Sequence, residues 1–294
     1  MKKGTKAASL LAVLAAGGLL RSQYEREHFV AEETRLYSPK LKRDRTLVFL
    51  TDLHDKEFGE NNARLLDAVA AVRPDGILIG GDTMVVKPGR ASLEVTKTLL
   101  AGLAAIAPVY YGNGNHEQRM RREQDTYGGL YREFRRILKR YGVRYLSDSS
   151  ADLGEDIRVS GLDIAGKYYR DFKPDRMRQS YVTRHLGQAS QERYQILLAH
   201  SPLFFQAYKG WGADLSLAGH FHGGTIRLPW LGGVMTPQYQ FFLPCCAGTF
   251  EQDGSCLIVG RGLGTHSVDI RFCNKPQVVV LRLTNREEED GKKR

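Results

Sequence analysis

The sequence has few cysteines, and none of them stands in a pattern that binds a structural metal. Cysteine occurs at only four of the 294 positions, with no Cys-x-x-Cys pair and no zinc-ribbon spacing. Adjacent cysteines such as Cys245 and Cys246 rarely bond to each other, so a dense disulfide framework is excluded. We expect four small buried residues, with a single bridge to Cys256 or Cys273 as the alternative.

The sequence also lacks an internal repeat and, apart from a charged tail at residues 285–294, any low-complexity tract. Its content of 42% hydrophobic and 26% charged residues is ordinary for a globular protein. No helix-turn-helix and no aromatic RNA-binding motif is present, so we do not expect nucleic acid as the partner.

Negative charge is under-represented, with 33 acidic against 43 basic residues and a net charge of +10. Such an excess favours anionic partners, namely phosphorylated molecules, nucleic acid or an acidic membrane surface, and does not choose among them. Many basic residues gather in residues 117–145, which also carry an apolar face. This segment could steer a phosphorylated molecule or rest on anionic lipid, and a solvated helix face explains it equally well.

No hydrophobic run reaches the ~20 residues of a comfortable membrane span. The uncharged stretch of residues 7–20 follows Lys2, Lys3 and Lys6 and ends at Arg21, which is typical of a signal peptide or an uncleaved anchor. We therefore expect residues 1–21 to be a signal or membrane anchor and residues 22–45 to be a tether. An ordinary buried helix is the alternative for residues 7–20.

From residue 46 onward, short apolar runs alternate with amphipathic stretches, the pattern of an α/β domain. The runs cover residues 47–50, 77–79, 109–111, 194–199 and 215–218. Continuous apolar strands separated by helices indicate a sheet that is covered on both faces. Residues 157–164, 256–259 and 278–283 are also strand-like, and we expect them to form a second sheet that packs on the first.

Each of the five apolar runs is followed at once by residues that can bind metal. Open α/β sheets bind ligands at the carboxyl ends of their strands, so these residues are candidates for one site. Five of the eight histidines are among them, which chance scatter would rarely produce. In chain order the candidates are Asp52, His54, Asp82, Asn115, His116, His200, His220 and His222. We expect the glycines beside them, Gly81, Gly114 and Gly219, to let the backbone turn sharply.

The ordered blocks Asp-x-His, Gly-Asp, Gly-Asn-His-Glu, His and Gly-His-x-His resemble the calcineurin-like metallophosphoesterase superfamily over residues 46–284. The closing segments, residues 219–229 and 261–283, resemble its bacterial branch with an N-terminal signal or anchor, although Gln277 stands where many relatives are acidic. The resemblance implies a four-layer α/β/β/α sandwich. It further implies one metal held by Asp52, His54 and His222, a second held by Asn115, His200 and His220, a bridging Asp82, and His116 as an acid or charge-stabilising group. Glu117 would support the ligands without binding metal.

Mixed nitrogen and oxygen ligands suit manganese, iron or zinc better than magnesium or calcium. Two such ions about 3.5–4 Å apart can stabilise the attacking and leaving oxygens of displacement at phosphorus, with a hydroxide shared by both ions as the nucleophile. We therefore expect hydrolysis of a phosphomonoester, a phosphodiester or a lipid pyrophosphate. The expected location is the cell membrane with the catalytic domain on the extracytoplasmic side, or secretion if the signal is cleaved. A noncatalytic metal-binding scaffold and a nuclease are the alternatives. His266 could line the site entrance, but a surface or core role is favoured.

Overall fold

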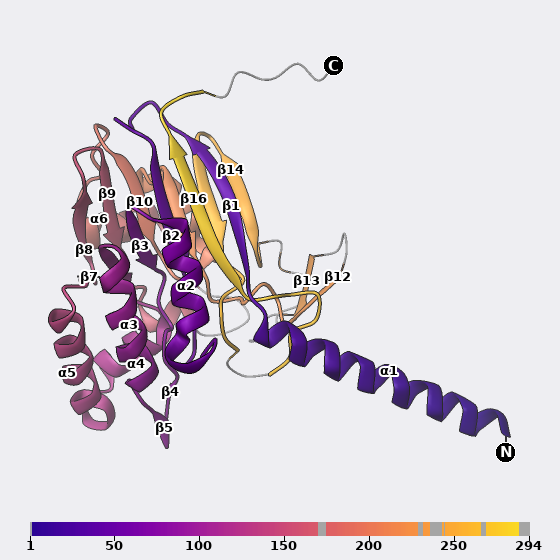
Figure 1. Ribbon diagram of the computed structural model, residues 1–294. Coiled ribbons are helices and arrows are strands. Elements are labelled where there is room, and N and C mark those ends of the chain that lie inside the picture. Colours follow the sequence, from indigo (N-terminus) through magenta and orange to yellow (C-terminus); the bar gives the residue numbers. More distant parts are fainter. Residues whose placement is uncertain are drawn as a thin grey trace, which may run out of the picture.

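Two six-stranded sheets pack face to face and carry helices on their outer sides in the computed structural model (Figure 1). The structure describes residues 2–169, 175–228, 232–235, 243, 245–265 and 269–287. In spatial order, the first sheet contains β1 (Val30–Tyr37), β16 (Gln277–Thr284), β2 (Arg45–Leu50), β3 (Gly76–Ile79), β6 (Val109–Gly112) and β7 (Arg144–Leu146). The second contains β14 (Gly248–Gln252), β15 (Ser255–Val259), β11 (Leu215–Ala218), β10 (Tyr194–Leu198), β9 (Ile157–Gly161) and β8 (Ser149–Leu153).

The helices are α1 (Lys2–Glu27), α2 (Ala63–Val72), α3 (Glu94–Ile106), α4 (Asn115–Arg122), α5 (Gln124–Arg140), α6 (Gln179–Leu186) and α7 (Phe205–Trp211). Short 3₁₀ turns cover Glu60–Asn62, Gly166–Tyr169 and Pro202–Phe204. Two small hairpins extend from the body, β4 (Val86–Lys87) with β5 (Arg90–Ala91), and β12 (Ile226–Leu228) with β13 (Gly232–Met235).

The alternation of side chains along β2 explains the layers. Val48 and Leu50 belong to the core under the helices of the first sheet, which include α2, α3 and α5. Leu47 and Phe49 point the other way, into the core between the two sheets. A third core packs the second sheet against α6 and α7. The expected α/β/β/α sandwich is therefore confirmed, with every strand of its centre buried on both faces.

The N-terminal region differs from the expected tether. Residues 30–37 form β1, which pairs in parallel with β16 along its whole length, from Val30 with Gln277 to Tyr37 with Thr284. Leu36 is the one buried side chain of this edge strand, so backbone hydrogen bonds and an ion pair of Glu33 with Arg282 hold it instead of an apolar stripe. The low apolar content that suggested a tether is a property of the sheet edge.

One further expectation needs correction. Residues 278–283 were expected in the second sheet but lie in β16 of the first, antiparallel to β2. The basic segment of residues 117–145 is divided between α4 and α5, and its apolar side chains Phe134, Ile137 and Leu138 are buried against the first sheet. Part of its charge also serves packing, since Arg135 lies over the Tyr145 ring and Arg121 pairs with Asp163.

Residues 7–20 lie within α1, which projects away from the sheets (Figure 1). Over the described ranges, we find no helix with the length and apolar content that a bilayer crossing requires. Of the expected charged tail, residues 288–294 lie outside the described residues.

Candidate metal centre

The ends of five strands bring seven of the eight candidate residues into one buried cluster. Asp52 and His54 follow β2, Asp82 follows β3, His116 follows β6, His200 follows β10, and His220 and His222 follow β11. Their potential ligand atoms form three overlapping groups, and within each group these atoms lie within 4.8 Å of one another: Asp52–His54–His222, His54–Asp82–His116 and Asp82–His200–His220. Because β2, β3 and β6 belong to one sheet and β10 and β11 to the other, the cluster joins the two sheets at one edge.

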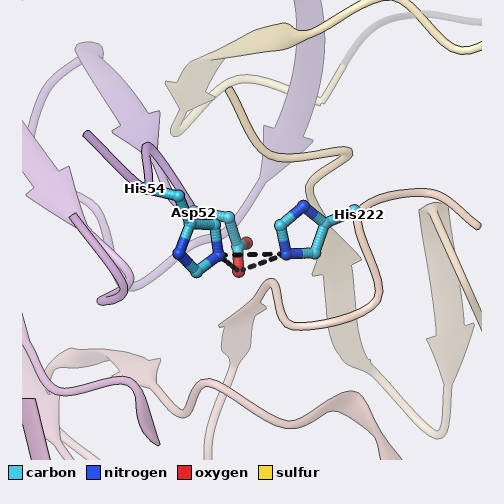
Figure 2. Close-up of side chains that lie close together, drawn as sticks. All are labelled: Asp52, His54 and His222. Atoms are coloured by element: carbon cyan, nitrogen blue, oxygen red, sulfur yellow. Dashed lines mark hydrogen bonds and ion pairs between the residues drawn. The ribbon is translucent and has the colours of Figure 1, made fainter. Parts of the chain in front are cut away.

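The first group is drawn in Figure 2, where both imidazole rings face the carboxylate of Asp52. Asp52 Oδ1 lies 3.8 Å from His54 Nε2 and 3.4 Å from His222 Nε2. The two Nε2 atoms are 3.1 Å apart, and the rings are stacked. Three ligand atoms therefore converge on one point, although they come from segments about 170 residues apart in the chain.

Asp82 connects this group with the third. Its Oδ2 lies 3.9 Å from His54 Nε2 and 3.2 Å from His200 Nε2. Asp52 Oδ1 also approaches His200 Nε2, at 3.6 Å. A carboxylate between two sets of imidazoles is the arrangement that two neighbouring cations would require.

Backbone carbonyls fix the rings of two histidines. Nδ1 of His200 donates to Gly80 O at 2.8 Å, and Nδ1 of His222 donates to Gly264 O at 3.1 Å. In each neutral ring this leaves the Nε2 lone pair directed toward the carboxylates. The tautomer that a metal ligand needs is thus set by the fold.

Five residues of the cluster occupy the left-handed backbone region, with φ values of 53° at Asp52, 50° at His54, 54° at Asp82, 72° at His220 and 51° at His222. Such conformations cost roughly 1–3 kcal/mol each in non-glycine residues and persist where surrounding contacts impose them. Hydrogen bonds from His54 N to Asp82 O and from Asp52 N to Gly81 O provide these contacts between the two loops.

The neighbouring glycines have two different roles. Gly81 has a φ of +92° and makes the sharp turn that we expected. Gly114 and Gly219 have no positive φ; instead, a Cβ at Gly114 would lie 2.2 Å from Asp82 Oδ1, and one at Gly219 would lie 2.1 Å from Asp52 Oδ2. These two positions must be glycine because the carboxylates fill the space.

Asp82, His220 and His222 have the protonation states that metal binding requires. Burial opposes ionisation of Asp82, but His200 and His116 hold its pKa well below the usual value. Burial lowers the pKa of His222, and that of His220 is lowered strongly by burial and by His200, so both rings are neutral near pH 7. His200 differs: although burial disfavours the cation, Asp82 and Asp52 raise its pKa to about 10, so the metal-free ring is protonated near pH 7 and would release the Nε2 proton when an ion binds. Ionised carboxylates and neutral imidazoles are the protonation states that divalent cations select.

Two buried polar atoms also indicate a missing partner. The side-chain oxygen of Asn115 has no hydrogen-bond partner, and His200 Nε2 makes no hydrogen bond although it lies 3.2 Å from Asp82 Oδ2. A buried polar atom without a hydrogen bond is costly, and a cation would satisfy both the Asn115 oxygen and the Nε2 atom of deprotonated His200. The donor set therefore fits two divalent ions, with Asn115, the first residue of α4, beside His116.

Glu117 has a larger role than the sequence indicated. Its buried carboxylate accepts hydrogen bonds from the backbone N–H groups of Asp82, Thr83 and Gly114 and from the Tyr111 hydroxyl. Burial and the Asp82 charge raise its pKa to about 7. Glu117 thereby ties the loop after β3 to the start of α4 and fixes Asp82 in place.

His116 lies against the cluster in a defined orientation. Its Nδ1 accepts a hydrogen bond from Val86 N at 2.8 Å, so the proton of the neutral ring is on Nε2. Burial lowers the pKa of His116. The Asp82 carboxylate acts in the opposite direction, and the positive charge of Arg119 lowers the pKa further. Tyr169, which no motif pointed to, places its ring centroid 5.0 Å from that of His220. His266 lies outside the described residues.

Comparisons with known proteins agree with this geometry. The family model for calcineurin-like phosphoesterases matches residues 45–224. The chain is 29% identical to an uncharacterized metallophosphoesterase of Campylobacter jejuni over 83% of its own length and 60% of that protein. It is 27% identical to the phosphodiesterase YaeI of Escherichia coli, with 81% of each chain covered. It is 28% identical to the UDP-2,3-diacylglucosamine pyrophosphatase LpxG of Chlamydia trachomatis, over 50% of this chain and 43% of that one. With the family model spanning more than half of the sequence and the buried His/Asp cluster at the strand ends, the chain belongs to the calcineurin-like phosphoesterase family, whose members are hydrolases.

Proposed function

We propose that the protein hydrolyses a phosphodiester or a pyrophosphate bond with two divalent transition-metal ions, manganese, iron or zinc. The observation that carries the proposal is the place of Asp82, whose carboxylate lies within 3.9 Å of His54 and 3.2 Å of His200 and can serve both ions. One ion would be held by Asp52, His54 and His222, and the other by Asn115, His200 and His220. When bound, the ions would polarise the phosphoryl group and lower the pKa of water.

The protein's own groups would position the substrate and move the proton. Because Nδ1 of His116 accepts the hydrogen bond from Val86 N, the neutral ring carries its proton on Nε2, which suits it to protonate a departing oxygen. Tyr169 would form one wall of the site beside His220. Since burial raises the pKa of Tyr169 well above 10, its hydroxyl remains a hydrogen-bond donor at neutral pH.

The substrate class is proposed from the relatives. YaeI is named as a phosphodiesterase and LpxG as a pyrophosphatase of a diacylated sugar nucleotide. Both activities break a phosphorus–oxygen bond whose phosphorus keeps a second substituent, and the positive net charge of +10 suits such anions.

We further propose that the enzyme works at an anionic membrane surface through α1. Val13, Leu19 and Leu20 are exposed on this helix, and three lysines precede them. The helix leads into β1 at Val30, which pairs with Gln277 at the end of the sheet where β2 delivers its ligands. A lipid substrate held in the membrane would thus approach the site from the side on which α1 leaves the body (Figure 1).

The central experiment is hydrolysis of bis-p-nitrophenyl phosphate with added Mn²⁺ by the wild-type protein and by Asp82→Ala. We expect activity that requires metal and that the substitution abolishes. A screen over nucleotide-lipid pyrophosphates, phospholipids and cyclic nucleotides would then identify the leaving group. Sedimentation with vesicles of phosphatidylglycerol, for the wild type and for Leu19→Glu, tests membrane binding. Metal-independent hydrolysis, or full activity of Asp82→Ala, would refute the dimetal proposal.

A further inference from the structure

The last turns of α1 are docked on the segment that holds the metal ligand His222. Two side chains of the helix are buried at this contact, Ser22 at 4% exposure and Glu25 at 0%. They stand three residues apart and therefore share one face of the helix. Both accept a hydrogen bond from a backbone N–H group of residues 269–274, Ser22 from Arg271 at 3.1 Å and Glu25 from Asn274 at 2.7 Å.

One path leads from this contact to the backbone of His222. The buried amide of Asn274 donates to His222 O at 2.7 Å and to Gly224 O at 2.8 Å. It thereby holds both ends of the turn that follows the ligand, in which His222 has a φ of 51°. The Glu25 carboxylate fixes Asn274 through its backbone N–H.

A second path leads to the His222 ring. The Arg271 guanidinium is 1% exposed and donates to Gly264 O at 2.7 Å, the carbonyl that also accepts the hydrogen bond from His222 Nδ1. The same guanidinium donates to the carbonyls of Arg261, Gly262 and Asn274. Arg271 is in turn held to the helix by Ser22. Backbone and ring of one ligand thus depend on two neighbouring contacts of α1.

We propose that Ser22 and Glu25 are positioning residues for the Asp52–His54–His222 metal site, so that docking of the N-terminal helix and occupancy of this site are coupled. The inference rests on the proposed dimetal function. A coupling free energy is reciprocal: the docked helix raises the affinity for the ion, and the bound ion stabilises the docked helix by the same factor. The proposed second site, with Asn115, His200 and His220, has no such contact to α1 among the described hydrogen bonds.

The test is metal binding by full-length Glu25→Ala, which removes the acceptor of the Asn274 N–H, with Glu27→Ala as the matched control on the exposed side of the same helix. Loss of an outer contact to a metal ligand typically lowers affinity about 10–100-fold. Titration of the metal-free protein with Co²⁺, followed by calorimetry and by the visible absorption of the ion, should therefore show one of two sites weakened by about that factor. The other site, and the Glu27→Ala protein, should bind as the wild type does.

A double-mutant cycle separates positioning from general destabilisation. If Glu25 acts through Asn274, the Glu25→Ala change should cost little further affinity in an Asn274→Ala background. Hydrogen exchange of residues 22–27 should slow when metal is added to the wild type and respond less in Glu25→Ala. Unchanged affinity in Glu25→Ala, or equal weakening of both sites together with a lower melting temperature of the metal-free protein, would overturn the inference while leaving the dimetal function intact. A wild-type protein that binds no metal would instead refute the proposed function itself.

Discussion

At the scale of single residues, the site depends on glycines that leave room for the carboxylates of the cluster. Gly114 lies so close to Asp82 that even a methyl group would displace the carboxylate. In contrast, Gly129 in the middle of α5 has nothing within 4 Å of the position where a Cβ would stand. Substitution by alanine should therefore have opposite effects at the two positions.

We expect Gly114→Ala to lower metal affinity and activity at least tenfold, because the new Cβ must displace the carboxylate that is proposed to serve both ions. Gly129→Ala should leave activity unchanged and stabilise the protein by roughly 0.5–1 kcal/mol, the gain of removing glycine from a helix. Metal content after dialysis and thermal unfolding measure the two effects. Retention of both ions by Gly114→Ala would contradict the close contact.

His116→Asn should separate catalysis from metal binding. An asparagine oxygen can still accept the Val86 N–H, but it removes the Nε2–H group. We expect kcat to fall about 10²–10⁴-fold while metal content stays the same. The loss should be smaller for p-nitrophenyl esters than for alkyl esters, because a good leaving group needs less protonation. An equal loss for both esters would argue against a role as general acid.

At the scale of elements, much of the site could be predicted from the sequence, whereas several segments that surround it and hold it in place could not. Asp52 and His200 could be recognised because each comes directly after a continuous apolar run, and such runs are buried strands. β1 could not be recognised, because an edge strand buries few side chains and its pairing with β16 joins residues nearly 250 positions apart. Asn274 and Tyr169 could not be recognised either, because their segments have no periodic pattern and their roles depend on tertiary contacts.

The opposite end of the first sheet has an ion pair that makes stability depend on pH. Asp156 accepts hydrogen bonds from Arg45 Nη2 at 2.8 Å and Lys42 N at 2.9 Å, joining the approach to β2 with the turn before β9. Burial would raise the pKa of Asp156, but these two partners lower it below the usual value. A lowered folded-state pKa stabilises the protein above the unfolded pKa of about 3.9. This contribution is lost as the pH falls through the folded-state value.

We therefore expect Asp156→Asn to cost about 1.5–3 kcal/mol at pH 7. The difference from the wild type should shrink as the pH falls below about 4 and approaches the lowered folded-state pKa, below which the wild-type carboxyl is also neutral. Urea unfolding at pH 7, 5 and 3 measures both effects. Glu155→Gln, which alters a fully exposed neighbour paired with Lys42, is the control and should change little. A difference that is constant with pH would show that packing and not charge explains the loss.

At the scale of the whole molecule, the cluster is the place where two separately built sheets meet. Asp52, His54, Asp82 and His116 come from the first sheet, and His200, His220 and His222 come from the second. The core between the sheets is apolar, and an ion held by Asp52 and His54 of one sheet and His222 of the other would fix the relative position of the strand ends. An ion bound here should therefore stabilise the folded protein in addition to its role in catalysis.

Removal of metal should lower the melting temperature substantially. An ion present at about 1,000 times its dissociation constant stabilises the folded state by about 4 kcal/mol, which corresponds to roughly 6–7 °C for a chain of this size. We expect calorimetry with EDTA to show this decrease and added Mn²⁺ to reverse it. In Asp82→Ala the response to Mn²⁺ should be much smaller, because neither ion keeps its shared carboxylate. If instead EDTA leaves the wild-type melting temperature unchanged, the ligands of the two sheets are not joined by a metal ion, and hydrogen bonds and apolar packing alone must hold this edge together.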